Sequence, residues 1–380
     1  MWAQPFQSER DTIEYLAMKS SELENILSQA RDGHGLTLRA MSALLKLDCP
    51  GQIEALFKAA RQVRKTFSHQ RIFLYGFLYT STHCRNNCRF CKFRRDNDGF
   101  RRYRKNFDQI VAAAARLASS GVHLIDLTMG EDPTLFRRGT DSLPELVRAV
   151  RQVSGLPLMV SPGWLPSYQL ELLAASGADW YACYQETHSK RLFRYLRPGQ
   201  DFGRRMAAKE AARKAGLLVE EGILCGIGES DRQVVDSLVA MAAMDADQVR
   251  VMNFVPQPGT PLAESPQANN LRERMIIAIM RLAFPDKLIP ASLDVEGLKG
   301  LRQRLDAGAN VVTSLVPPGE GFCGVAGGRL DIDNARRTAP AVRRVIESAG
   351  LRVAQPQELG AWMRLRRHAV VRRGSLWRSA

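Results

Sequence analysis

Residues 72–91 read IFLYGFLYTSTHCRNNCRFC, an apolar run followed at once by three cysteines. A near-continuous apolar run is typical of a strand that is buried on both faces of a parallel sheet. Cys84, Cys88 and Cys91 then stand at the spacing C-x3-C-x2-C. The stretch therefore predicts a buried strand that carries three thiols on the loop after it.

The rest of the chain repeats the pattern of a buried strand followed by an amphipathic helix. Apolar runs predict strands over 72–78, 122–127, 158–161, 180–184, 219–224, 249–254, 288–293 and 311–315. Helical periodicity predicts helices over 107–119, 143–153, 168–175, 204–215, 231–244, 270–283 and 295–307. Eight such units are the count for a closed (β/α)8 barrel, whereas an open doubly wound sheet is the alternative. We therefore expect an α/β protein built on a (β/α)8 TIM barrel.

Segments outside the repeat complete the predicted organisation. Residues 1–70 read as an N-terminal helical extension, with helices over 38–47 and 52–67. The barrel domain spans 71–350 and ends in a helix over 339–348. Residues 351–380 form a C-terminal basic extension, whose part from 363 onward carries six Arg and no acidic residue. We expect that tail to be a frayed, solvated appendage.

Composition excludes several classes of protein. The chain has 380 residues, of which 45% are hydrophobic and 24% charged, which excludes a disordered, collagen-like or disulfide-dense chain. Neither a signal peptide nor an apolar run of membrane-spanning length is evident, so we expect a cytoplasmic protein with no membrane partner. The net charge of +15 raises the alternative of a nucleic-acid-binding protein. No run of stacking aromatics accompanies the basic residues, so we expect no nucleic-acid partner.

The cysteine triplet carries the strongest chemical signal. Iron–sulfur clusters are held by cysteine thiolates, normally four. Three ligands without an obvious fourth leave one iron open to a small molecule. The alternative is a zinc site with His83 as fourth ligand, but structural zinc sites favour a second Cys/His pair, and none follows. We therefore expect a [4Fe–4S] cluster on Cys84, Cys88 and Cys91.

With Phe90 before its last cysteine, the triplet resembles that of the radical S-adenosylmethionine superfamily. Further blocks are similar to the methylornithine synthase family of pyrrolysine biosynthesis, in the branch that includes biotin synthase. They are DLTMGED (126–132), YQET (184–187), EGIL (221–224), RVM (250–252), QPGTP (257–261), IPASLD (289–294) and AGANVVT (307–313). The resemblance covers roughly residues 70–350. The remaining cysteines stand singly, so no second cluster of the biotin synthase kind is expected.

The resemblance implies S-adenosylmethionine as the cofactor, chelated by the open iron and cleaved by one electron to a 5′-deoxyadenosyl radical. The residues that it assigns to the cofactor are Phe90, Met129, Gly130, Glu131, Glu186, Arg205, Gly226 and Gly228. It also implies an electron donor such as flavodoxin or ferredoxin. We expect the protein to act as a monomer.

The implied reaction converts L-lysine to 3-methylornithine, and another small molecule is the alternative substrate. Asp126, Arg250, Ser292 and Asp294 are the candidate substrate residues. Two acids and one base complement the two ammonium groups and one carboxylate of lysine, and buried charges need such partners. By resemblance Arg250 binds the carboxylate, Asp294 and Ser292 hold the amino-acid end, and Asp126 helps with an ammonium. The rearrangement needs no general base, so no catalytic residue is expected beyond the cluster and the cofactor.

Overall fold

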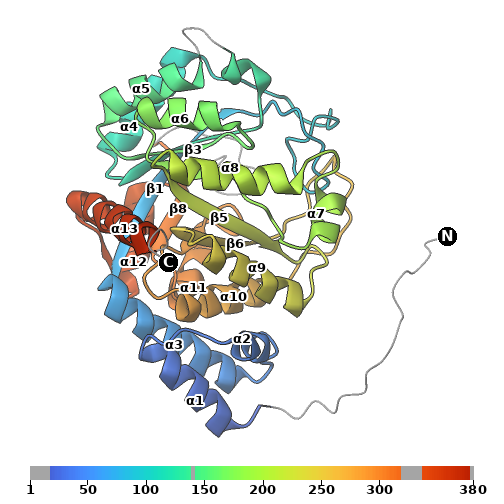
Figure 1. The fold of residues 1–380 in the computed structure, drawn as a ribbon, viewed down its shortest axis with the longest axis vertical. Coiled ribbons are helices and arrows are strands. Elements are labelled where there is room, and N and C mark those ends of the chain that lie inside the picture. The colour runs from blue at the N-terminus through green and yellow to red at the C-terminus, as the bar shows by residue number, and fades with distance from the viewer. Residues whose placement is uncertain (1–17, 138–141, 318–335, 377–380) are drawn as a thin grey trace, which may run out of the picture.

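A nearly closed barrel of eight parallel strands forms the centre of the protein (Figure 1). The computed structural model describes residues 18–137, 142–317 and 336–376, with side chains up to residue 368. Around the barrel β1 pairs with both β2 and β8, and a bridge between Gln248 and Leu288 joins β6 to the start of β7. The predicted (β/α)8 barrel is confirmed. Its strands are β1 (Arg71–Ser81), β2 (Leu124–Met129), β3 (Leu158–Ser161), β4 (Trp180–Ala182), β5 (Leu218–Cys225), β6 (Gln248–Asn253), β7 (Pro290–Ser292) and β8 (Val311–Leu315).

Helices surround the barrel, as the amphipathic stretches predicted. No helix within the described ranges is long and apolar enough to cross a membrane. One prediction was wrong in detail: 295–307 is not one helix but a 3-10 turn, η2 (Gly297–Gly300), followed by a short helix, because Gly297 takes the left-handed φ of 59°. The surrounding helices are α4 (Phe107–Ser119), α5 (Leu143–Ser154), α6 (Ser167–Ala175), α7 (Lys190–Leu196), α8 (Phe202–Lys214), α9 (Asp231–Ala243), α10 (Asn270–Ala283) and α11 (Leu301–Asp306).

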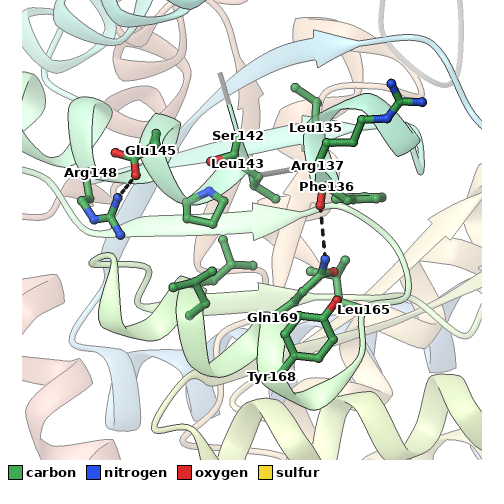
Figure 2. A pocket seen from close by; sticks show the side chains of 13 residues that line it. Leu135, Phe136, Arg137, Ser142, Leu143, Glu145, Arg148, Leu165, Tyr168 and Gln169 are labelled. Atoms are coloured by element: carbon green, nitrogen blue, oxygen red, sulfur yellow. Dashed lines mark hydrogen bonds and ion pairs between the residues drawn. The ribbon is translucent and has the colours of Figure 1, made fainter. Parts of the chain in front are cut away.

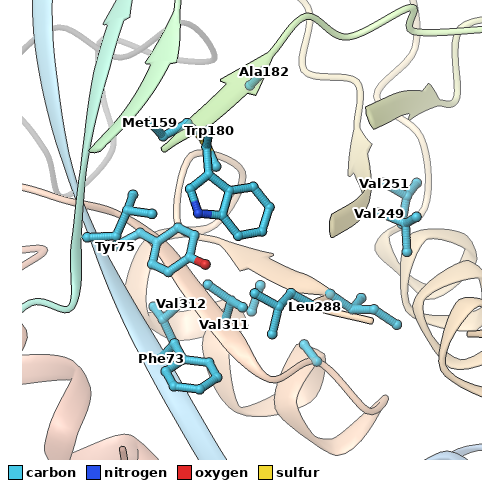
Figure 3. Close-up of a cluster of buried hydrophobic side chains, with 14 of the residues drawn as sticks. Phe73, Tyr75, Met159, Trp180, Ala182, Val249, Val251, Leu288, Val311 and Val312 are labelled. Carbon is cyan, nitrogen blue, oxygen red and sulfur yellow. The ribbon is translucent and has the colours of Figure 1, made fainter. Parts of the chain in front are cut away.

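Apolar side chains from both faces of the strands make one continuous core. The residues of β1 after Arg71 are all buried, which is why its sequence is apolar without alternation. Figure 3 shows part of this core, with Tyr75 of β1, Met159 of β3 and Trp180 of β4 among the side chains drawn. Charged side chains that enter this interior therefore need partners inside it.

Three N-terminal helices, α1 (Ser20–Arg31), α2 (Leu38–Leu44) and α3 (Pro50–Ser68), lie against one side of the barrel (Figure 1). Helix α3 contacts α10 and buries Leu56, Ala60 and Val63. Helices α2 and α3 confirm the predicted helices over 38–47 and 52–67, whereas α1 was not predicted. The extension thus belongs to the same hydrophobic core as the barrel.

The prediction of a frayed tail from residue 363 onward was wrong for residues 363–368, where Met363 and Arg366 are buried, and residues 377–380 lie outside the described part of the chain. After α12 (Ala339–Ser348) and the short β9 (Arg352–Val353), helix α13 (Pro356–Leu376) packs on the barrel. Trp362 stacks on Trp180 with ring centroids 5.8 Å apart and planes 6° apart. Arg366 is buried, and its Nε lies 2.7 Å from an oxygen of Asp247. Acidic residues just before β4 and β6 thus pair with arginines of α13 that have no acidic partner nearby in the sequence.

We predict that Trp362→Ala lowers the free energy of unfolding by about 1–3 kcal/mol, because it removes an aromatic pair that fixes α13 to β4. Leu365→Ala on the same helix is the control, since its side chain is 72% exposed and the change should stay within about 0.5 kcal/mol. Urea unfolding of the three proteins measures the difference. Equal stabilities would show that the helix is not held by this contact.

Candidate functional site

The three cysteines lie on the loop that follows β1. The side chain of Arg102 holds this loop in place by donating hydrogen bonds to its backbone carbonyls. Arg102 donates hydrogen bonds to the carbonyls of Thr82 at 2.8 Å and Phe93 at 3.1 Å. Burial raises the pKa of the Cys91 thiol, and the charges of Cys88 and Cys84 raise it further. The effect of these two charges shows that the three thiols lie near one another. A loop fixed in this way carries three neighbouring thiols.

The end of β2 lies directly against this loop, and Gly130 makes the approach possible. A Cβ at Gly130 would lie 2.2 Å from the carbonyl oxygen of His83, which is closer than any side chain allows. Arg85 in turn donates its backbone N–H to the carbonyl of Glu131. The DLTMGED block is thereby held beside the cysteines.

Two side chains that follow α7 donate hydrogen bonds to the sulfur of Cys88. Arg197 Nη1 lies 3.3 Å and Gln200 Nε2 lies 3.0 Å from that sulfur. Such donors stabilise a thiolate, which is the form that binds metal. Within the described ranges, no three His, Cys, Asp or Glu side chains gather around a single ion position. A cuboidal cluster binds each cysteine at a different iron, so this donor set fits a cluster.

Acidic and basic residues of the predicted cofactor site lie next to the loop. Glu186 is buried with a left-handed φ of 66°, and its Oε1 lies 2.7 Å from Arg197 Nη2. Burial raises the pKa of Glu186, while the charges of Arg197 and Arg205 act against that shift. Arg205 Nη1 lies 3.1 Å from Glu131 Oε1, and both residues line a cavity of about 280 Å³. The sequence analysis missed Arg197, which lies outside the quoted blocks.

Three more residues that the resemblance assigns to the cofactor lie around the end of β5. Phe90 packs with Leu224 and Ile227 at the end of β5. Gly226 and Gly228 take left-handed φ angles of 81° and 95°, which favour glycine. The turn that they form therefore depends on its Gly-x-Gly pattern.

Inside the barrel, Arg250 of β6 forms an ion pair that was not predicted. Its Nε lies 2.7 Å from Glu220 Oε1, and both side chains are almost wholly buried. The Tyr184 hydroxyl donates to the other Glu220 oxygen at 2.9 Å, and Arg250 Nη1 donates to Thr313 Oγ1 at 3.2 Å. Arg250 Nη2 has no partner among the described residues. Glu220 and Glu221 are adjacent on a predicted buried strand, so their side chains must face opposite sides of it. This pattern was a signal for such a pair, because a buried carboxylate needs a cationic partner.

Asp126 of β2 lies close to this ion pair. Ser161 donates to its Oδ1 at 2.8 Å, whereas its Oδ2 is buried without a partner among the described residues. Burial raises the pKa of Asp126 to about 7, and Glu220 adds to the shift while Arg250 opposes it. The Tyr75 hydroxyl is likewise buried without a partner. Unpaired buried polar groups are costly, so their presence together indicates a binding site for a polar ligand.

Asp294, a predicted substrate residue that could instead have capped the next helix, already has side-chain partners within the protein. Its Oδ1 accepts from Tyr79 at 3.1 Å and from Arg337 Nη1 at 2.9 Å, and its Oδ2 accepts from Ser314 at 2.7 Å. Ser292 Oγ lies 3.5 Å from Oδ2 and accepts the backbone N–H of Asp294. Arg337 was not singled out from the sequence, because nothing local distinguishes it from Arg336 beside it.

A separate pocket of about 500 Å³ lies on the outside of the barrel (Figure 2). It is lined by residues of α5, of the 3-10 turn η1 (Pro133–Phe136) and of α6, among them Tyr168 and Gln169, and by Leu165 before α6. None of the predicted site residues lines it. Size alone therefore does not make it the candidate site.

Comparisons with known proteins agree with this geometry. The model of the radical SAM superfamily matches residues 78–240. The chain is 40% identical over 344 residues to the 3-methylornithine synthase of Methanosarcina barkeri, covering 90% of this chain and 98% of that protein. It is 30% identical to the [FeFe] hydrogenase maturase subunit HydE of Thermotoga maritima, over 73% of this chain and 79% of that one. A crystal structure of methylornithine synthase superposes with a TM-score of 0.84 at 40% identity, covering 89% of this chain and 99% of that one.

We predict that Asp126→Asn changes how stability depends on pH. The ordinary pKa of this carboxyl is 3.8 and its folded value is about 7, so between these values the folded chain binds more protons than the unfolded chain. The free energy of unfolding of the wild type therefore falls as pH rises from about 4 to 7 because of this group. The asparagine variant lacks that loss, so it should gain roughly 3–4 kcal/mol relative to the wild type between pH 4 and 8. Urea unfolding across this range tests it, and parallel curves would contradict it.

Proposed function

Because the chain belongs to the 3-methylornithine synthase family of the radical S-adenosylmethionine superfamily, we propose that it rearranges L-lysine into 3-methylornithine in pyrrolysine biosynthesis. The observation that carries this proposal is the set of buried, mixed charges inside the barrel beside a three-cysteine loop. A small, doubly cationic amino acid matches that set in its kinds of charge. The cluster and S-adenosylmethionine, which the family uses, supply a 5′-deoxyadenosyl radical when bound.

We propose Cys84, Cys88 and Cys91 as the cluster ligands. Their support is their place together on the loop after β1 and the two donors on the sulfur of Cys88. Arg197 is added to the predicted set as a residue that orients Glu186 and stabilises a thiolate at Cys88.

The proposed cofactor residues are supported by their place between the cluster loop and the strand ends. Arg205 has an Nε without a described partner, which suits the cofactor carboxylate. Glu186 suits the cofactor ammonium, because burial favours a cationic neighbour for its carboxylate. The adenine would lie against Phe90 and the turn at Gly226 and Gly228, which the apolar packing around Phe90 supports.

For the substrate we propose Asp126, Arg250, Ser292 and Asp294, as the resemblance implies. Support comes from the unpaired Asp126 Oδ2 and Arg250 Nη2, which are buried and need partners. The surrounding tyrosines and strands exclude water, which keeps reactive fragments together during a carbon-skeleton rearrangement. Holding and shielding the substrate is what these residues contribute.

Reductive activation needs an external electron, and we propose a flavodoxin or ferredoxin as its donor. We propose a monomer as the working unit, since all the proposed cluster, cofactor and substrate residues belong to one chain.

We predict that anaerobically reconstituted protein binds about four irons per chain. It should form 3-methylornithine from lysine, S-adenosylmethionine and a reductant. Cys88→Ala should lose both iron and product, whereas Cys49→Ser, at an exposed cysteine before α3, should keep both. Iron analysis and mass spectrometry of the products measure this. One zinc in place of iron, or a different product from lysine, would overturn the assignment.

We predict that Asp294→Asn lowers lysine-dependent turnover by roughly 30-fold or more, because it leaves the buried Arg337 guanidinium without its carboxylate. Arg250→Lys should also fail, since a point charge cannot replace a guanidinium that bridges Glu220 and Thr313. Iron content and the slow lysine-independent cleavage of S-adenosylmethionine should survive in both variants. Wild-type formation of 3-methylornithine by either variant would show that these residues have only a structural role.

A further inference from the structure

Arg337 is a buried arginine whose position is set by the end of β8. It lies between β8 and α12, and its carbonyl accepts the backbone N–H of Val316 at 2.8 Å. Its side chain is fully buried, and its guanidinium pairs with Asp294 through Nη1 alone. The other two nitrogens, Nε and Nη2, have no partner among the described residues.

The two unpaired nitrogens lie on the same side of the guanidinium. Their N–H groups point in parallel, which is the geometry that binds both oxygens of one carboxylate. No other arginine within the described ranges has two fully buried nitrogens without a partner. Arg250 differs, since its Nε is taken by Glu220 and only its Nη2 is free. Arg337 therefore offers a carboxylate two parallel donors, whereas Arg250 offers a single unpaired nitrogen.

The backbone of β8 is distorted at Ser314, next to the threonine that contacts Arg250. In a regular strand neighbouring side chains face opposite sides. Ser314 instead has a left-handed φ of 68°, and both its hydroxyl and that of Thr313 contact interior charges. Thr313 accepts from Arg250, and Ser314 donates to Asp294. Such strain persists where surrounding contacts enforce it and is frequent at ligand sites.

We propose that Arg337 is a specificity-determining residue that binds the α-carboxylate of the diamino-acid substrate through Nε and Nη2, beside Arg250. The proposal rests on the proposed function and adds to it. Asp294, which pairs with Nη1 of the same guanidinium, then lies next to the α-ammonium, since both groups sit on one carbon of an amino acid. The distal ammonium faces the unpaired Oδ2 of Asp126. The barrel therefore selects an α-amino acid over a plain diamine.

The test compares lysine with 1,5-diaminopentane, which keeps both ammonium groups and lacks the carboxylate. Binding of each is measured by anaerobic calorimetry on cluster-loaded protein with S-adenosylmethionine and without reductant. Arg337→Gln should weaken lysine binding by roughly 30-fold or more, whereas diaminopentane should bind as tightly as before or more tightly. Arg344→Gln, an exposed arginine on α12 with the same change of charge, should alter neither.

Arg337→Lys keeps a cation beside Asp294 and removes the fork, so it decides the question if the glutamine variant fails to fold. It should lose lysine affinity and keep that for diaminopentane. Unchanged lysine binding, or an equal loss for both ligands, would overturn the assignment of Arg337. If the variants overturn the role of Arg337 but the wild type makes 3-methylornithine, the proposed function stays intact. If the wild type binds lysine but makes another product, only the proposed function is overturned.

Discussion

The ion pair between Arg250 and Glu220 is the contact on which the interior of the barrel depends. It joins β6 to β5 in a place that water does not reach, and Tyr184 and Thr313 extend it toward β4 and β8. Desolvating two charges is expensive, and further hydrogen bonds offset this cost by satisfying both oxygens of Glu220 and two of the three nitrogens of Arg250. Removing either partner would leave a buried charge alone. The pair therefore favours one arrangement of four strands over alternatives.

The fold was largely predictable because a parallel barrel repeats one local pattern. Strands buried on both faces read as apolar runs, and β3 and β8 have the predicted bounds. The helix α13 was not predictable in this way, because its arginines find their partners on loops far away in the sequence. The apolar face of α13 is short, with Leu359, Trp362 and Met363 among arginines, so its periodicity is weak and the tertiary structure reveals that it is docked.

In the candidate site, too, residues that are close in sequence were predictable, whereas residues whose partners lie far away in the sequence were not. Cys84, Cys88 and Cys91 are neighbours in sequence, so their spacing alone predicted a shared ligand. Glu220 and Arg337 act through partners 30 and 43 residues away, and no local pattern reports such distances. What the sequence could report was that charges on buried strands need partners. It could not say which residues would supply them.

The charge balance explains why the substrate class could be inferred without these partners. Two acids, Asp126 and Asp294, and one base, Arg250, were predicted from the sequence. The structure adds one acid, Glu220, and one base, Arg337, so the sum over these described residues stays at one negative charge. Lysine, with two ammonium groups and one carboxylate, supplies the matching positive charge. What changes is the geometry: the added pair occupies most of Arg250 and leaves Arg337 with a free fork. Net charge thus selects the class of ligand, while the pairing among the buried groups determines which of its ends each residue can bind.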